Sequence, residues 1–286
     1  MGSVVARRGV RRQLEAIAVY LLLVLVALAF LFPLLWAVAS SFRPLNDVFR
    51  YTVPFSWRAF VPIPFTVQPY VVVLQSGFTR ALVNTLFVGL VTVGAGVLAN
   101  SLAGFAFGVF RFRGQRVLFS FVVLTFLVPF EAIVIPLYIM VAAFGWQNTF
   151  QALIVPAIAN GLVIFLFRQF FAGLPRELIE AARVDGLSWF GVWARIAMPL
   201  SLPVIVTASM MLFLTQWQSF FWPLLVANAP QYQMVQVALT NFQTQYVTVW
   251  NQLFAAATIT SIVPVIMLLG LQRYYVQSVA GTGLKG

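Results

Sequence analysis

The sequence predicts an all-α, polytopic membrane protein with six transmembrane helices, and its composition and hydropathy pattern support this prediction. Of the 286 residues, 62% are hydrophobic and only 8% are charged, whereas soluble domains carry about 25% charged residues. A helix needs roughly 20 apolar residues to cross a bilayer. Six segments meet or approach that length, and no long polar region remains for a soluble domain. We therefore expect residues 1–286 to form a single transmembrane domain.

The predicted crossings differ in how polar or proline residues interrupt them. The first is almost free of polar side chains, and its apolar run is longer than the roughly 7–15 residues of a cleaved signal peptide. The second carries a face of small residues, suited to close helix contact, between Gly89 and Gly108. The third contains Pro129, Glu131 and Pro136. The expected helices cover about residues 16–40, 81–107, 117–143, 150–168, 200–226 and 253–273.

Three longer segments connect these helices. Residues 41–80 form a predicted external loop with several prolines, which disfavour a long helix and favour short helical pieces. Residues 228–252 form a second external loop, rich in Gln and Asn, that could meet a binding protein or a solute, or be a solvated loop. Residues 169–199 form a predicted cytoplasmic loop, which is the longest polar interruption expected on the inner side of the membrane.

The placement of the basic residues predicts the orientation of the chain. The net charge is +11, with 17 Lys and Arg in total. With a cytoplasmic N-terminus, only Arg43, Arg50, Arg58 and Arg80 fall on the outer side, and the other basic residues lie inside. This is the positive-inside bias of membrane proteins. We expect both termini in the cytoplasm, in the cytoplasmic membrane of a bacterium or archaeon, with the lipid bilayer and no nucleic acid as a partner.

The residue types that are absent exclude several classes of function. The chain has no Cys and no His, which removes thiolate chemistry, His-based triads and zinc sites of the usual kind. Only six residues are acidic, so general acid–base catalysis has few candidates. No phosphate-binding Walker A sequence is present. We expect no catalytic residue, no metal site and no cofactor bound by this chain.

The cytoplasmic loop has the local signals of two short helices joined by a turn. Pro175 is placed to begin the first helix, and Glu180 lies near the positive end of its dipole. Gly186 is suited to the left-handed conformation that ends a helix. Ser188 is a suitable N-cap for a second helix over residues 189–197. On composition alone, these helices could also rest at the membrane interface without a partner.

The order of residues in this loop resembles the EAA loop of ABC importer permeases, with Met198 where Leu is common. The flanks Arg168–Phe171 and Leu174–Leu178 look like those of carbohydrate permeases of the maltose-transporter type, and the similarity runs from about Leu14 to the C-terminus. Each short motif is weak by itself, whereas the ordered set is specific. The matching positions of the loop are Glu180, Ala181, Ala182, Gly186, Ile196, Met198 and Pro199.

The resemblance implies a type I ABC importer permease fold and a set of partners. These are a second, related permease subunit, two copies of a cytoplasmic ABC ATPase that uses ATP and Mg, and an external sugar-binding protein. The implied solute is an oligosaccharide, a disaccharide or a related polyol or glycerol-phosphate compound. In such importers the EAA loop is the coupling helix, which sits in a cleft of the ATPase. Closure of the ATPases then moves the permeases between inward- and outward-facing states.

The resemblance also implies roles for individual residues of the loop. Glu180 would pair with a basic group on the ATPase, and Ala181 and Ala182 would allow close packing. Gly186 would fix the bend, and Asp185 beside it would cap or pair. Ile196 and Pro199 would anchor the cytoplasmic loop to the fifth crossing.

Polar groups inside the crossings are candidates for the solute path. Glu131 is the only acidic residue within a crossing, where a charge is costly and often functional. It could couple protons, bond a neighbouring helix or face the solute. Gln216, Trp217 and Gln218 could bind a sugar through amides and an aromatic face, or bond other helices. After Trp217 the family often has Asn-Asp, whereas this chain has Gln218-Ser219, which removes a carboxylate.

Two other functions fit an integral membrane protein. One is a proton-coupled secondary carrier that uses Glu131; such a carrier is expected to have inverted repeats and paired discontinuous helices, and the sequence shows neither. The other is a membrane scaffold that transports nothing.

Overall fold

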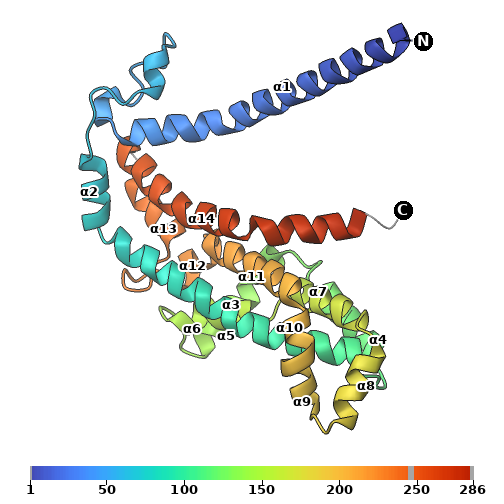
Figure 1. The fold of residues 1–286 in the computed structure, drawn as a ribbon. Helices are drawn as coiled ribbons and strands as arrows, with labels where there is room; N and C mark the ends of the chain where they lie inside the picture. Colours follow the sequence, from blue (N-terminus) through green and yellow to red (C-terminus); the bar gives the residue numbers. More distant parts are fainter. Residues whose placement is uncertain (1, 244–247, 284–286) are drawn as a thin grey trace. The chain divides into compact units, whose positions relative to one another are not determined.

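The computed structural model describes the backbone of residues 2–243 and 248–283 and the side chains of residues 13, 15–243 and 248–271. Regular structure in these ranges is helical, apart from one isolated antiparallel bridge between Gln243 and Thr248 (Figure 1). The predicted all-α class is confirmed. The chain forms two compact units: a first unit of residues 1–76 and 242–259, and a second unit of residues 77–241 and 260–286.

The first unit combines a long apolar helix with the external segment that follows it. It holds α1 (Gly2–Ser41), short 3₁₀ turns, α2 (Gln68–Gln75) and the first turns of α14 (Trp250–Gly283). Aromatic rings join these pieces, because Trp36 of α1 lies 5.3 Å from Phe254 of α14 between ring centroids. The segment expected as a loop over residues 41–80 therefore contains the predicted short helical pieces: Leu45–Asp47, Trp57–Phe60 and α2.

Arg43 fixes the external segment of the first unit from within. Its side chain is fully buried, and its Nη2 donates hydrogen bonds to the carbonyl oxygens of Arg58 and Val61, the latter at 2.7 Å. Its own carbonyl accepts from Nδ2 of Asn251 at 3.0 Å. Burial lowers the pKa of Arg43, and nearby Tyr51 opposes this shift. Arg43, which the sequence analysis placed on the outer side, is therefore a buried residue that connects parts of the first unit by hydrogen bonds.

The second unit is organised around α3 (Phe78–Val109), which packs mainly against α7 (Gly161–Ala172), α11 (Leu202–Trp217) and α6 (Phe150–Ile158). A Cβ at Gly104 would lie only 2.4 Å from Cβ of Phe167, so this glycine allows α3 and α7 to approach closely. Gly94, by contrast, has open space around it. The predicted small-residue face is therefore used at some positions and not at others.

Three of the predicted crossings are broken rather than continuous. Residues 117–143 form α4 (Gln115–Thr125) and α5 (Phe130–Ala143), which are bent by 98°. The single helix predicted for this crossing is two helices instead, because Pro129 has no N–H for helical bonding and disfavours a helical residue before it. Residues 150–168 divide into α6 and α7 at Ala159 and Asn160, and residues 200–226 divide into α11 and α12 (Phe221–Val226).

The breaks change how spans are counted without removing the membrane character. Four described helical stretches are long and apolar enough to cross a bilayer: Glu15–Ser41, Phe78–Val109, Phe150–Ala172, which includes the interruption between α6 and α7, and Trp250–Leu271. The number rises to as many as six if α4 with α5, and Trp189–Leu200 with Leu202–Trp217, are each one bent span. The first and last helices also extend beyond their predicted ends.

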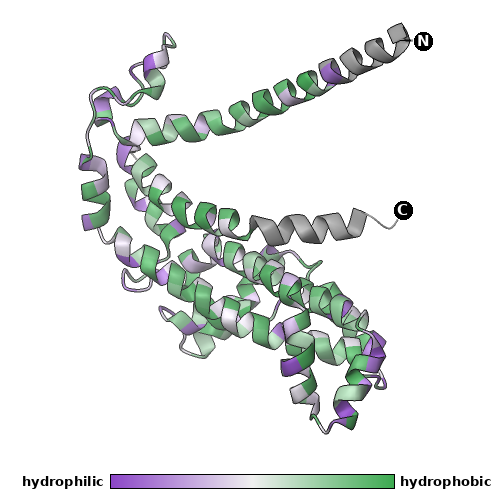
Figure 2. Ribbon diagram, viewed as in Figure 1, coloured by the Kyte–Doolittle hydropathy of each residue, from purple (hydrophilic) through white to green (hydrophobic). Residues whose placement is uncertain are grey.

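The charged loop forms a helical hairpin at one end of the second unit (Figure 1). It consists of α8 (Arg176–Val184), α9 (Trp189–Val192) and a π-helical turn, Trp193–Ala197, that leads through α10 (Met198–Leu200) into α11. Figure 2 shows hydrophilic residues on α8 and hydrophobic colour along much of α3 and α11. The segment before α14 contributes one more short helix, α13 (Val235–Leu239).

Candidate functional site

The turn of the α8–α9 hairpin follows from two residues predicted to shape it. Gly186 has φ of +83°, the left-handed conformation that ends α8. The N–H of Leu187 donates to the carbonyl of Ala182, and that of Gly186 to the carbonyl of Arg183, each at 3.1 Å. Ser188 then caps α9, since its Oγ accepts from the N–H of Gly191 at 3.1 Å. Both local predictions are confirmed.

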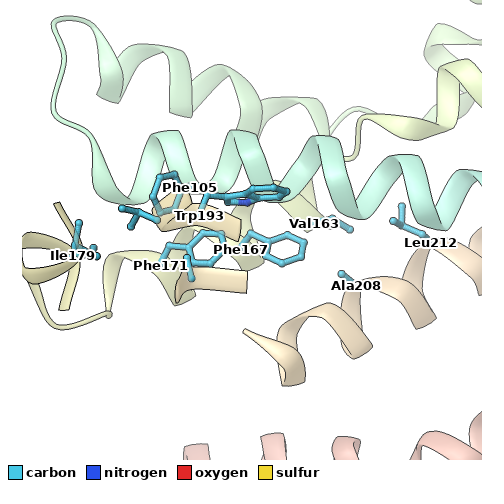
Figure 3. Packing of buried hydrophobic residues seen from close by; sticks show 11 residues of the cluster. Phe105, Val163, Phe167, Phe171, Ile179, Trp193, Ala208 and Leu212 are labelled. Carbon is cyan, nitrogen blue, oxygen red and sulfur yellow. The ribbon is translucent and has the colours of Figure 1, made fainter. Parts of the chain in front are cut away.

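The inner side of the hairpin is fixed to the rest of the second unit by apolar packing. Ile179, Ala182 and Trp193 are buried in one cluster with Phe105 of α3 and Phe171 of α7 (Figure 3). Ala182 is therefore buried within its own chain, whereas the resemblance implied that it allows close packing with the ATPase. The hairpin is therefore packed tightly against α3 and α7.

The two arms of the hairpin are also tied to each other. The guanidinium carbon of Arg183 lies 4.7 Å from the ring centroid of Trp189, and Nη1 of Arg183 donates to the carbonyl of Leu187. Trp189 contacts Phe110, at the C-terminal end of α3, with ring centroids 4.9 Å apart. These contacts hold the two helices of the hairpin against each other and against the end of α3.

The outer side of the hairpin exposes both charges and apolar groups. Glu180, Ala181, Asp185 and Gly186 are exposed, and Glu180 and Asp185 make no ion pair within the described residues. Val184 beside them is 86% exposed. Ile196 is half-buried against the core cluster, and Pro199 is exposed just before α11. An exposed surface of charged side chains of both signs beside an apolar group is suited to contact with another protein.

A cavity of about 430 Å³ lies in the second unit where the three helix breaks meet. Phe130, the first residue of α5, lines it, as do Asn160 at the break between α6 and α7 and Ser219 at the break between α11 and α12. Non-helical backbone at membrane depth occurs where it is buried in protein or lines a cavity. The breaks and the cavity are therefore parts of one feature.

Asn100 of α3 holds the break between α6 and α7 in place. This residue is 1% exposed. Its Nδ2 donates to the carbonyl of Ile158 at 2.8 Å, and its Oδ1 accepts from the N–H of Asn160 at 2.9 Å. Asn160 in turn caps α7 by accepting from the N–H of Val163 at 3.1 Å.

Carbonyls of α6 around Pro156 are satisfied by side chains from the other side of the cavity. Pro156 has no N–H, so the carbonyl of Ala152 loses its helical donor. Nε1 of Trp222 donates to that carbonyl at 2.9 Å. Nε2 of Gln216 donates to the carbonyl of Leu153 at 3.0 Å and to Oγ1 of Thr92 at 3.2 Å. These bonds keep the wall of the cavity formed by α6 in a single arrangement.

Of the predicted solute-path residues, only Gln216 lines this cavity. Trp217 is buried and stacks on Phe213 with centroids 5.4 Å apart. Gln218 is exposed and lies outside the lining. Glu131 is exposed in the first turn of α5 and does not line the cavity either.

Among the polar residues of this wall that sequence reasoning missed, Asn160 and Ser219 lie at helix breaks. A signal for the first exists in the sequence, because Asn160-Gly161 follows Pro156 inside an apolar run, which is typical of a helix interruption. Ser219 was noted only as a departure from the family pattern. Its place on the cavity depends on a break that no local signal marks clearly.

Comparison with known proteins identifies the family. The family model for the inner membrane component of binding-protein-dependent transport systems matches residues 96–281. This chain belongs to that family. The matched range includes the α8–α9 hairpin and most of the residues that line the cavity.

Three similar proteins span nearly the whole chain. The arabinooligosaccharides transport system permease protein AraQ of Halalkalibacterium halodurans is 29% identical, covering 91% of this chain and 93% of that protein. The sn-glycerol-3-phosphate transport system permease protein UgpE of Rhizobium meliloti is 28% identical, covering 95% and 98%. A solved bacterial ABC transporter involved in importing the acidic polysaccharide alginate has a similar fold, with a TM-score of 0.79, 21% identity and coverage of 92% and 96%.

Family membership confirms that the chain is a permease component of an ABC importer located in the inner membrane. It does not favour the proton-coupled carrier. The sequence-based argument against that carrier was partly wrong, because it found no discontinuous helices and the structure contains them at three places. Broken helices alone therefore do not separate these two kinds of transporter.

Proposed function

We propose that this chain is the membrane subunit through which a carbohydrate or related polyol crosses the inner membrane, driven by ATP hydrolysed on a separate subunit. The similarity to permeases named for arabinooligosaccharides and sn-glycerol-3-phosphate supports this solute class. An external binding protein delivers the solute. The chain works beside a second, related permease and two copies of an ATPase, which bind the ATP and Mg; both of its termini lie in the cytoplasm.

The exposed, stiff α8–α9 hairpin is the observation that supports this mechanism most strongly. Glu180 and Asp185 present carboxylates without partners in the described part of the chain, and Ala181 leaves room for a partner backbone. Gly186 sets the bend. Ala182, Ile196 and the residues before Pro199 connect the hairpin to the core and to α11. Closure of the ATPases would move this hairpin, and the packed cluster would carry the movement to α3, α7 and α11.

The test is ATP-driven uptake by the complete transporter reconstituted in proteoliposomes. Gly186→Val should strain the left-handed turn, reduce uptake at least tenfold and weaken recovery of the ATPase with the membrane subunits. Gly114→Val is the matched control, because Gly114 also has φ of +83° and open space around it but lies outside the hairpin.

The charge on the hairpin is tested separately. Glu180→Ala should lower uptake and ATPase recovery, whereas Glu177→Ala, an exposed carboxylate one turn earlier in α8, should have a smaller effect. Normal uptake and normal complex recovery in both Gly186→Val and Glu180→Ala would contradict the docking role.

A further inference from the structure

The cavity at the three helix breaks presents free hydrogen-bonding groups of both kinds. Asn160 uses its Oδ1 as a helix cap, and its Nδ2 donates no hydrogen bond among the described residues. Gln216 uses its Nε2 in both of its side-chain hydrogen bonds. Its Oε1 accepts no hydrogen bond from the described residues. The hydroxyl of Ser219 can donate and accept, and no described residue bonds it.

Aromatic side chains complete the wall around these polar groups. Phe130, Phe220 and Trp222 line the cavity, and Phe130 meets Trp222 edge to face with centroids 6.0 Å apart. The volume of about 430 Å³ lies within the usual range of small-molecule sites. An apolar, partly aromatic wall with a few fixed polar groups is the usual construction of a ligand site, and each hydroxyl of a sugar can both donate and accept.

None of the residues that line this cavity is charged. Glu131 follows Phe130 directly and yet lies outside the lining. An anionic group placed here would lose its hydration without meeting a cation of this chain, which is strongly unfavourable. A hydroxyl group loses much less, because the free amide and hydroxyl groups can replace the bonds it made to water.

We propose that this cavity is a solute subsite on this subunit itself, and that it takes an uncharged sugar unit rather than a phosphorylated or acidic one. The proposal rests on the proposed function and narrows it, because the relatives include permeases named for both a neutral oligosaccharide and a phosphate ester. Asn160, Gln216 and Ser219 would bond the hydroxyls of the sugar, and the aromatic groups would cover its apolar face. The hydrogen bonds of Asn100 and Trp222 hold this wall in place.

The absence of Cys from the chain allows a direct test of occupancy. Ser219→Cys places a single thiol of this subunit in the cavity of the complete reconstituted transporter, and its reaction with N-ethylmaleimide is followed by mass spectrometry of this subunit. Ser209→Cys is the matched control: it lies in α11, the helix that ends just before Ser219, but lines a separate apolar groove with Met210 and Val263.

Uptake by the unmodified transporter comes first, with arabinotriose, lactose, sn-glycerol 3-phosphate and an alginate trisaccharide as probes. If none is imported in an ATP-dependent way, the proposed function fails. If an anionic probe is imported and the neutral ones are not, the proposed function stands and the uncharged subsite is wrong. If a neutral probe is imported, it should slow labelling of Ser219→Cys at least threefold and leave Ser209→Cys unaffected; equal labelling rates with and without it would overturn the subsite.

Transport kinetics give a second measurement with the imported neutral probe. Ser219→Ala and Asn160→Ser, which keeps a helix-capping oxygen and adds no charge, should each raise the KM for uptake about threefold to tenfold, as expected for one lost hydrogen bond. Ser209→Ala should leave KM unchanged. Unchanged KM in both cavity variants, with normal recovery of the complex, would also overturn the proposal.

Discussion

The α8–α9 hairpin and the cavity at the helix breaks lie in the same unit but are specified in different ways. The hairpin depends on residues a few positions apart, such as Gly186 for the turn and Ser188 for the cap. The cavity depends on residues far apart in the sequence, such as Asn100 with Asn160 and Ala152 with Trp222. The hairpin exposes charged side chains, whereas none of the described residues that line the cavity is charged.

In the proposed mechanism, energy input at the hairpin and solute contact at the cavity are separated within one helical unit. The connection between the two is α3, which supplies Phe105 to the cluster beneath the hairpin and Thr92 to the wall of the cavity. The tight packing of α3 on α7 is therefore the part of the unit on which both regions depend.

The largest expected effect comes from breaking that packing. In Gly104→Ala the new Cβ would lie 2.4 Å from Cβ of Phe167 and 2.9 Å from the backbone nitrogen of Arg168, so the helices must move apart. We expect a loss of about 1–3 kcal/mol in the free energy of unfolding, measured by thermal denaturation of the purified subunit complex, together with reduced uptake.

Gly94→Ala is the matched control for that substitution, since Gly94 is also in α3 and has nothing within 4 Å of the added Cβ. It should be neutral or stabilising by about 0.5–1 kcal/mol because alanine favours the helix. Equal effects of the two substitutions would show that the approach of α3 to α7 does not join the two regions.

A second substitution tests the long-range bonds that build the cavity wall. Trp222→Phe keeps an aromatic ring but removes the donor to the carbonyl of Ala152, which Pro156 has deprived of its helical partner. We expect about 1–3 kcal/mol of destabilisation from the unsatisfied carbonyl. The hairpin should keep its function, so the ATPase should still co-purify with the membrane subunits.

Trp217→Phe is its matched control, because Nε1 of Trp217 is buried without a hydrogen-bond partner in the described part of the chain. This substitution removes a similar volume and no hydrogen bond. The role given to the indole N–H of Trp222 would be wrong if both variants unfolded at the same temperature.

The smallest effect is expected at Glu131, which belongs to neither region. Glu131→Gln should leave ATP-driven uptake within about twofold of the unmodified transporter, since the side chain is exposed and does not line the cavity. Uptake should also be insensitive to a protonophore in both forms. A gradient-dependent component that disappears in Glu131→Gln would favour the proton-coupled carrier.

Local sequence rules were accurate wherever neighbours in the chain decide the structure. The helix start near Pro175, the left-handed Gly186 and the cap at Ser188 are all present as predicted. The first and second crossings are also continuous, as their uninterrupted or small-residue sequences indicated. The ordered residues of the loop were sufficient to indicate the family, which the family model then confirmed.

The rules failed where a polar side chain from another helix replaces a missing backbone bond. A long apolar run reads as one helix even when it contains Pro129 or Pro156, because hydropathy does not record where hydrogen bonds go. Around the interruption between α6 and α7, Asn100, Gln216 and Trp222 supply those bonds to carbonyls of α6. Gln216 was named for a solute path, but Asn160 and Ser219 could not be placed beside it from sequence alone.

The sequence by itself determined the membrane class, the predominance of helices and the form of the cytoplasmic hairpin, because hydropathy and capping act over one or two turns. The tertiary structure decided how the broken helices are held, which amides remain free and that none of the described residues lining the space between them is charged. The physical reason is that backbone groups in an apolar environment must find hydrogen-bond partners, and only the packed fold determines which side chains are close enough to provide them.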